Sequence, residues 1–351
     1  PPRSTLFPYT TLFRSTYSLP QTEFQIPSGP MSYSSIALVP PGALDFTGEA
    51  ARRRRTLQRD TLGVLEAAGF EELIPPTFEY EEIFLRAGGP AVRDRMIRFL
   101  DLDGRGLALR YDFTAALARV AATALADRPT PLRLCYSGKV YRQEPDHGDR
   151  SREILQVGAE LLGAGGLAAD LELLRLTLAL VRAAGIRDFQ INIGHVGVLA
   201  PALSSLPDDL RADVRRWIDR KDRASLARAL KGASSNVAAL GELAFVVGRH
   251  DALDAARGLV GQDGVPALTH LLALDDALTE DERGHVVYDL GEVRGLEYYT
   301  GIQFEVFVAG LGRAAGAGGR YDELMGRFGR PMPAVGVSLD LDALAELEPQ
   351  A

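Results

Sequence analysis

The alternation of apolar and polar positions predicts a helix followed by a strand at the start of the interpretable chain. From Glu49 to Gly69, apolar side chains recur at helical spacing, and a glycine ends the run. The next segment contains Pro75 and Pro76, which cannot continue a helix and are typical of a strand edge. The pattern therefore predicts a helix that leads into a proline-marked strand.

The central part of the chain alternates between strand and helix patterns. A turn at Asp103–Gly104 joins two short apolar runs, and the second run leads into the helical sequence AALARVAATAL. Asp112 and Thr114 therefore lie at a predicted strand-to-helix junction. Two strand-like runs then flank a polar loop at 145–151, which is too long for a tight turn and is typical of a functional loop.

Farther along the chain the pattern changes twice. Residues 171–184 are helical, and we expect Asp170 to cap the start of this helix and Gly185 to mark its end. Residues 189–195 alternate like a strand. From 196 to 284 the strand alternation disappears and Gly or Pro separates several short helices, so we interpret this range as a helical insertion.

The strand pattern returns after residue 285. In GIQFEVFVAG, alternate apolar positions share one face, namely Ile302, Phe304, Val306 and Val308. Adjacent strands joined by short turns indicate an antiparallel sheet. We expect the closing segment AVGVSLDLDALAEL to form a helix. The glycine-rich run GLGRAAGAGGRYDELMGRFG is interpreted as loop, because it lacks the G-K-[ST] ending and the βαβ context of a phosphate-binding loop.

The composition is that of an ordinary globular protein. Of 351 residues, 46% are hydrophobic and 25% are charged. No apolar run approaches the roughly 20 residues of a membrane span, so we expect a soluble, cytoplasmic protein with no membrane partner. The single cysteine, Cys135, excludes an internal disulfide, and the five histidines have no ligand spacing. Neither a metal site nor a cofactor is therefore expected.

The charge distribution weighs against a nucleic-acid partner. The formal net charge is -8 at pH 7, whereas contacts to phosphates need clustered Lys and Arg. The one basic run, Arg52–Arg55, belongs to the first helical pattern. We interpret it as a solvated helix face rather than an RNA-binding patch.

The first thirty residues do not fit the pattern of the remaining chain. They contain no initiating Met and no signal-peptide regions, and the stretch PPRSTLFPYTTLFRS resembles translated sequencing-adaptor sequence. Met31 is the first methionine. We therefore expect a non-native or disordered leader at 1–30, a first part of the core at 31–195, the helical insertion at 196–284 and a second part of the core at 285–351.

Three blocks of sequence carry the candidate chemistry. The first contains Pro76, the second runs from KVYRQEP to Gln156, and the third is GGRYDELMGRFGRPMPAVGVSLDLDAL at 318–344. Together they resemble motifs 1, 2 and 3 of class II aminoacyl-tRNA synthetases. RGLEYYTGIQFE at 294–305 resembles the histidine-binding signature of the histidyl branch. The resemblance implies an α+β fold with a mixed, mainly antiparallel sheet flanked by helices, a helical insertion, and dimerisation through the motif 1 region.

The resemblance also implies one polar pocket for one amino acid. Asp112, Thr114 and Gln156 would bind the ammonium group of the ligand. Arg142 and Arg294 would bind its carboxylate, since a guanidinium recognises a carboxylate through two parallel hydrogen bonds. Leaving such a group unpaired costs about 1 to 3 kcal/mol, which would reject other ligands.

The side chains around the imidazole would complete this pocket. The resemblance implies this place for Glu160, Tyr299 and Tyr321, because a carboxylate and phenol hydroxyl groups can satisfy both ring nitrogens. Tyr298 belongs to the same histidine-binding set. Taken alone, Arg294, Tyr298 and Tyr299 could equally be a surface arginine beside two sheet tyrosines.

The part of the sequence that corresponds to the nucleotide site departs from the synthetase pattern. Ala343 stands where the class has an arginine that binds the ATP phosphates, and Asp340 replaces a usual glycine. Losing one charge-assisted hydrogen bond costs about 1.5 to 3 kcal/mol, so adenylate formation should be impaired. Alternatively, Asp340 and Asp342 simply begin a helix. Three residues still match the nucleotide-facing part of motif 2, namely Arg142, Glu144 and Arg150.

A second departure concerns the end of the chain. It stops at Ala351, shortly after motif 3, so we expect it to lack the anticodon-binding domain of histidyl enzymes. A histidyl-like core without that domain and without the motif 3 arginine is similar to the regulatory subunits of ATP phosphoribosyltransferase. This resemblance implies a chain without catalysis of its own. It would bind histidine as a homodimer within a hetero-oligomer, activate the short catalytic subunit and mediate feedback inhibition of histidine biosynthesis.

Two alternatives remain open at this point. The first is a catalytic core of an active histidyl-tRNA synthetase, which predicts histidine-dependent pyrophosphate exchange. The second is a histidine-binding module with an unrelated partner, which predicts histidine binding without any effect on ATP phosphoribosyltransferase.

Overall fold

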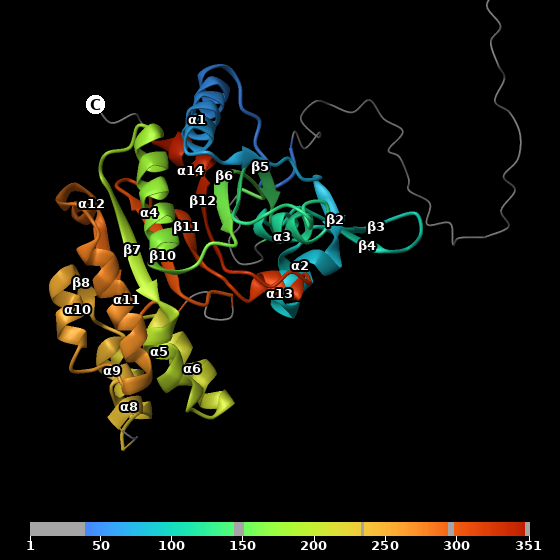
Figure 1. The fold of residues 1–351 in the computed structure, drawn as a ribbon. Coiled ribbons are helices and arrows are strands. Elements are labelled where there is room, and N and C mark those ends of the chain that lie inside the picture. The colour runs from blue at the N-terminus through green and yellow to red at the C-terminus, as the bar shows by residue number, and fades with distance from the viewer. Residues whose placement is uncertain (1–38, 144–150, 233–234, 294–297, 348–351) are drawn as a thin grey trace, which may run out of the picture. The chain divides into compact units, whose positions relative to one another are not determined.

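The fold is built around a nine-stranded mixed sheet (Figure 1). The computed structural model describes residues 39–143, 151–232, 235–293 and 298–347, and the elements below belong to the unit Pro41–Ala351. The strands of the sheet are β1 (Glu71–Glu72), β5 (Leu132–Tyr141), β6 (Glu153–Leu162), β7 (Phe189–His195), β8 (Val247–Gly248), β9 (Val286–Asp289), β10 (Ile302–Val308), β11 (Ala314–Arg320) and β12 (Ala334–Asp340). Their order is β1-β5-β6-β12-β11-β10-β7-β9-β8. All neighbours are antiparallel except β1–β5 and β7–β9, which confirms the predicted α+β fold with a mixed, mainly antiparallel sheet.

A second, three-stranded sheet leads into the site. It consists of β2 (Phe78–Tyr80), β3 (Arg98–Leu100) and β4 (Gly106–Leu109), in the order β2-β4-β3. The predicted turn joins β3 to β4, and Gly104 has a φ of 82°, which residues other than glycine rarely adopt. Thr114 begins α3 (Thr114–Ala122), so the predicted strand-to-helix junction is confirmed.

Helices cover both faces of the large sheet (Figure 1). On one face, α1 (Gly48–Ala67) and α4 (Gly166–Ala183) share a core cluster with Cys135 of β5. On the other, α2 (Glu81–Gly88) and α3 share a second cluster with Leu134 and Tyr136 of the same strand. Because successive side chains of a strand point to opposite faces, β5 contributes to both cores in turn.

The segment 196–284 consists mostly of short helices. They are α5 (Val196–Ser204), α6 (Asp208–Asp219), α7 (Arg223–Ala229), α8 (Ser235–Ala238), α9 (Leu240–Leu243), α10 (His250–Ala256), the 3-10 helix η3 (Gln262–Gly264), α11 (Val265–Asp276) and α12 (Glu280–Gly284). This helical segment also contains the short strand β8, and its α11 packs against α4 and β7. The remaining elements are η2 (Pro90–Arg95), α13 (Leu324–Arg327) and α14 (Leu341–Glu346).

The structure corrects the predicted start of α4. The helix begins at Gly166, and Asp170 lies inside it with 1% of its surface exposed. Gly185, with a φ of 79°, does follow the end of the helix as predicted. An aspartate near a helix start resembles a cap in the sequence, but here its carboxylate binds side chains from other elements.

Two further predictions were wrong at the end of the chain. The glycine-rich run contains the central strand β11, and the first half of the predicted closing helix is β12, with α14 following it. A Cβ on Gly318 would lie 2.4 Å from the carbonyl oxygen of Gly336, so glycine allows these strands to approach. A strand built from such small residues lacks the β-branched pattern by which strands are recognised.

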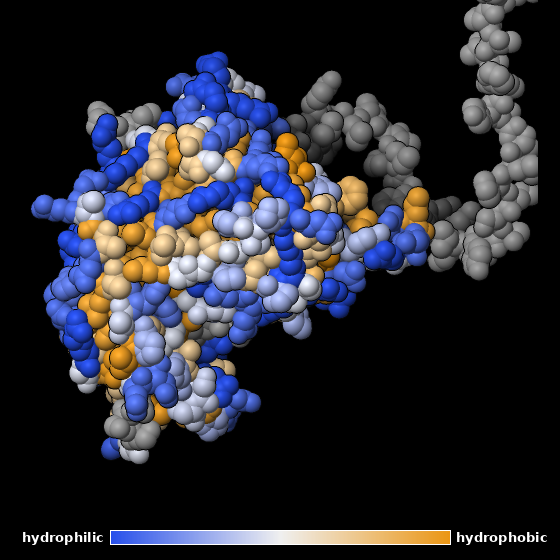
Figure 2. All heavy atoms as spheres, in the orientation of Figure 1, coloured by the Kyte–Doolittle hydropathy of each residue, from blue (hydrophilic) through white to orange (hydrophobic). Residues whose placement is uncertain are grey.

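The surface combines polar and apolar areas. No helix within the described ranges has the length and apolar character needed to cross a membrane. Figure 2 shows apolar surface at the β3–β4 hairpin. Exposed apolar side chains of this hairpin include Phe99, Leu100 and Leu102. Phe78 of the neighbouring β2 is also exposed, and its ring meets that of Phe99 edge to face with the centroids 6.0 Å apart.

Candidate functional site

A cavity of about 940 Å³ is lined by α1, α3, α14 and strands β5, β6, β10, β11 and β12. Eight of the nine residues that the sequence implies for histidine binding line it, namely Asp112, Thr114, Arg142, Gln156, Glu160, Tyr298, Tyr299 and Tyr321. Arg294 lies outside the described residues, as do Glu144 and Arg150. The fold therefore brings side chains from both parts of the predicted core into one cavity.

A buried carboxylate lies at the centre of this set. Glu160 is 1% exposed, and its Oε1 accepts a hydrogen bond from Thr114 Oγ1 at 2.6 Å. Its Oε2 accepts a hydrogen bond from the hydroxyl group of Tyr321. Burial raises the pKa of Glu160 to about 7, although both hydrogen bonds act in the opposite direction. The nearby charge of Asp112 raises it further, so Glu160 can hold or release a proton near neutral pH.

The space for Glu160 depends on a glycine in the neighbouring strand. Glu160 of β6 pairs with Gly336 of β12, and a Cβ on Gly336 would lie 1.7 Å from Glu160 Oε2. On β6, the strand of Glu160, a Cβ on Gly158 would lie 2.3 Å from the hydroxyl oxygen of Tyr136. Because glycine has no side chain, these two positions leave room for Glu160 and Tyr136, which a larger residue would displace.

Tyrosine side chains form one wall of the cavity. The rings of Tyr298 and Tyr321 have centroids 5.3 Å apart, and those of Tyr298 and Tyr299 are 5.1 Å apart. Burial, followed by the charge of Glu160, raises the pKa of all three phenols. They therefore remain protonated and can donate hydrogen bonds to a ligand.

Tyr136 is a cavity residue that the sequence interpretation missed. It is 2% exposed, stacks on Phe113 with centroids 4.1 Å apart, and has a pKa raised by burial and by Glu160. Its place in the strand pattern of β5 was visible in the sequence, but an inward tyrosine of a strand is usually a core residue.

The cavity also contains charged side chains near the tyrosines. Arg142 Nε donates a hydrogen bond to the carbonyl oxygen of Tyr111 at 3.1 Å, and its guanidinium lies 5.1 Å from the ring centroid of the same residue. Asp112 accepts a hydrogen bond from the amide of Ala115 at 2.8 Å. Burial raises the pKa of Asp112, whereas that amide and Arg142 lower it. One cation and one carboxylate thus line the cavity beside the neutral tyrosines.

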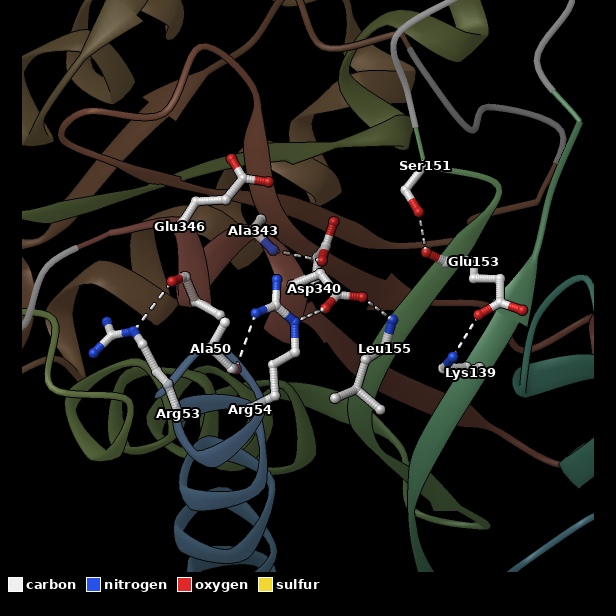
Figure 3. Close-up of polar contacts among 12 residues, drawn as sticks. Ala50, Arg53, Arg54, Lys139, Ser151, Glu153, Leu155, Asp340, Ala343 and Glu346 are labelled. Atoms are coloured by element: carbon white, nitrogen blue, oxygen red, sulfur yellow. Dashed lines mark hydrogen bonds and ion pairs between the residues drawn. The ribbon is translucent and has the colours of Figure 1, made fainter. Parts of the chain in front are cut away.

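The part of the cavity beside α1 and α14, its second half, contains two arginines that are bound to carboxylates, and Figure 3 shows the surroundings of Arg54. Arg54 of α1 donates a hydrogen bond to Asp342 of α14 at 2.6 Å, and the two side chains are 15% and 14% exposed. The other oxygen of Asp342 accepts the backbone amide of Leu155 at 2.7 Å. The ring of Phe46 covers the Arg54 guanidinium, which lies 3.4 Å from the ring centroid. This ion pair joins the first helix of the fold to the last.

A second ion pair lies in the same half. Asp340 begins α14, where its Oδ1 accepts the amide of Ala343 at 2.8 Å, and its Oδ2 accepts a hydrogen bond from Arg313 at 2.8 Å. Burial raises the pKa of Asp340, and the hydrogen bonds lower it. Arg313 also lies 3.4 Å from Glu346. The alternative that Asp340 begins a helix is therefore confirmed.

The basic run on α1 was interpreted wrongly for two of its four arginines. Arg53 donates hydrogen bonds to the carbonyl groups at the end of α14, including Ala345 at 3.1 Å, and Arg54 lines the cavity. Helical spacing placed them on the polar face of α1. It could not reveal that α14, almost 300 residues later, would cover this face.

One further group among the described residues has the geometry for a cation. His250, Asp275 and Asp276 bring three ligand atoms within 4.8 Å of one another. Asp275, however, already accepts a hydrogen bond from Tyr288 at 3.0 Å and lies 3.2 Å from Arg283. Its charge is therefore neutralised within the protein.

Comparisons with known proteins agree with this geometry. The family described as histidyl-tRNA synthetase matches residues 42–344. The ATP phosphoribosyltransferase regulatory subunit of Moorella thermoacetica is 38% identical over 316 residues, which cover 87% of this chain and 80% of that protein.

Two solved structures are similar over most of the chain. An ATP phosphoribosyltransferase regulatory subunit/histidyl-tRNA synthetase from Bacillus halodurans C has a TM-score of 0.79 and 31% identity, and the match covers 89% of this chain and 83% of that one. A histidine–tRNA ligase subunit from Alicyclobacillus acidocaldarius has a TM-score of 0.75 and 30% identity, with 89% and 98% covered.

Proposed function

Because this chain belongs to the family of ATP phosphoribosyltransferase regulatory subunits, we propose that it binds histidine in its cavity and conveys that binding to the catalytic subunit as feedback inhibition. In the absence of histidine it supports the activity of the same partner. The observation that carries the proposal is the buried Thr114–Glu160–Tyr321 group, which lies in a cavity whose other half holds internally paired charges.

The chemistry of the cavity supports histidine as the ligand. Glu160 and the tyrosine hydroxyl groups offer one acceptor and several donors, which together match both nitrogens of an imidazole. The pKa of Glu160, about 7, lies close to the roughly 6.5 of a free imidazole, so one proton can be shared between them. Asp112 and Gln156 would bind the ammonium group, and Arg142 with Arg294 the carboxylate.

The paired charges support a chain that binds without turnover. ATP phosphates need free cations, whereas Arg54 and Arg313 are engaged by Asp342 and Asp340. The same carboxylates repel a triphosphate. Ala343 offers no cation in their place.

The surface supports the proposed homodimer. The β2–β4–β3 sheet follows Pro76, the motif 1 proline, and Phe78 and Leu100 are 53% and 74% exposed. Contiguous apolar surface of this kind is typical of protein interfaces. We propose that two copies pair here, within a hetero-oligomer with the short catalytic subunit.

An active synthetase is the second candidate. The likeness to a histidine–tRNA ligase subunit favours it, as does the presence of Arg142 at the cavity. It requires ATP to displace the two ion pairs of the second half. Pyrophosphate exchange separates the two functions.

Titration calorimetry of the purified chain tests the ligand. Histidine should bind at one site per chain. Histidinol lacks the carboxylate and glutamine lacks the imidazole, so each should bind at least about tenfold more weakly because site groups are left unpaired. Equal binding of all three compounds would contradict the proposal.

A further inference from the structure

A buried carboxylate outside the cavity joins three distant segments of the chain. Asp170 of α4 accepts two hydrogen bonds on Oδ1 from Arg320, from Nε at 2.9 Å and from Nη2 at 2.6 Å. Its Oδ2 lies 2.8 Å from Nε2 of His270 on α11. Asp170 is 1% exposed and Arg320 6%, so this ion pair is shielded from solvent, whereas the His270 side chain is 25% exposed.

Arg320 is next to both segments that contain the tyrosines of the cavity wall. It directly precedes Tyr321, whose hydroxyl group binds Glu160. Its carbonyl oxygen accepts the amide of Thr300 at 2.7 Å, and Thr300 directly follows Tyr299. The packing here leaves little freedom, because a Cβ on Gly301 would lie 2.9 Å from Cδ of Arg320.

A second acid completes the anchor of Arg320. Nη1 of Arg320 donates to Asp322 at 3.0 Å, and the same Asp322 oxygen accepts the amide of Ala334 at 2.9 Å. The amide of Asp322 donates to the hydroxyl group of Thr300 at 2.9 Å. The side chain of Arg320 therefore anchors Asp322, and Asp322 in turn binds Thr300 and Ala334.

His270 is the member of the network that comes from the helical segment. Its ring meets that of His195 edge to face, with centroids 5.6 Å apart. His195 accepts the amide of Gly197 on Nδ1 at 3.0 Å, and burial, with His270 and Arg320 nearby, lowers its pKa to about 4. A neutral His195 thus supports His270 in the orientation that reaches Asp170.

We propose that Asp170, Arg320 and His270 are positioning residues, which make histidine affinity depend on how the helical segment 196–284 is docked against the core. The inference rests on the proposed function and adds to it a route between the cavity and a surface of the chain. Coupling between two sites is reciprocal. Histidine in the cavity should therefore stabilise α11, and a partner that moves the helical segment should change histidine affinity.

The test compares two histidines of the same helical segment. His270→Leu removes the contact with Asp170. His250→Leu is the matched control, because His250 also binds an aspartate at 2.8 Å, Asp275, which has no link to Arg320. His270→Gln keeps a donor for Asp170. The readouts are the histidine Kd by calorimetry and the protection of residues 265–276 from hydrogen exchange on adding histidine.

His270→Leu should raise the histidine Kd about 3- to 30-fold and abolish the protection of α11. His250→Leu should leave both unchanged, and His270→Gln should restore the Kd to within about threefold of the wild type. Wild-type affinity in a folded His270→Leu variant would overturn the inference and leave the proposed function standing. A wild-type chain that binds no histidine would instead overturn the proposed function.

Discussion

Arg54 on α1 and Asp342 on α14 form an ion pair of 2.6 Å, although 288 positions separate them in the sequence. Both side chains line the cavity. Because Asp342 also holds the amide of Leu155, one carboxylate joins both helices to the sheet. These two charges therefore stabilise the fold.

Replacing Asp342 should destabilise the protein. Asp342→Asn removes the charge opposite a guanidinium that is only 15% exposed, so we expect a loss of about 1 to 3 kcal/mol in the free energy of unfolding. Asp254→Asn is the control, since the side chains of its ion pair with Arg257 are 52% and 60% exposed and the pair should contribute much less to stability. Urea unfolding measures both, and equal losses would disprove the structural role.

The chain should not form histidyl-adenylate. With Arg54 and Arg313 bound to carboxylates, no histidine-dependent exchange of pyrophosphate into ATP is expected. Ala343→Arg alone should not restore it, because Asp340 still carries its charge beside the new cation. Exchange by the unaltered chain would support the synthetase alternative.

Histidine affinity should have a maximum near pH 7. The pKa of Glu160 is raised to about 7 and that of free imidazole is roughly 6.5, and we expect the complex to hold one proton between them. Above this range both groups are deprotonated and binding must take up a proton. Below it both are protonated and binding must release one, so affinity falls in both directions.

Glu160→Gln should remove the fall in histidine affinity at high pH. Without the carboxylate only the imidazole titrates, so affinity should rise through about pH 6.5 and then stay level. Calorimetry in buffers of different ionisation enthalpy counts the protons exchanged. Identical profiles for the variant and the wild type would exclude Glu160 from ligand binding.

The hydroxyl group of Tyr321 should contribute directly to affinity. Tyr321→Phe removes a donor to Glu160, which should weaken histidine binding about tenfold and raise the pKa of Glu160 further. Thr61→Val is the control, because it loses a buried hydroxyl hydrogen bond within α1, to the carbonyl oxygen of Leu57 at 2.6 Å, and Thr61 does not line the cavity. Its histidine Kd should not change, and a tenfold loss there would mean that both effects are structural.

The sequence predicted most elements of the core and eight of the residues that line the cavity, but not their surroundings. The alternation of Ile302 to Val308 and the turn at Asp103–Gly104 are local patterns, and the structure confirms both. Glu160 and Tyr321 were found by resemblance to a family. No local pattern could pair them, because Tyr321 follows β11, and β12 lies between β11 and the strand of Glu160, β6.

The features that were missed have a common cause. Arg54 and Asp170 are polar residues on helices, and their meaning is set by partners more than 100 positions away. The strand β11 was missed because its glycines are selected by the close approach of β12 rather than by strand propensity. Tertiary contacts decided all three cases.

The most direct test of the account is the activity of the short catalytic subunit of ATP phosphoribosyltransferase from the same source, measured with and without this chain across a histidine titration. The account predicts activation by the chain, and reversal of that activation by histidine. It also predicts that Glu160→Gln still activates but responds to histidine only at higher concentration. Activity that is the same with and without the chain at every histidine concentration would contradict it.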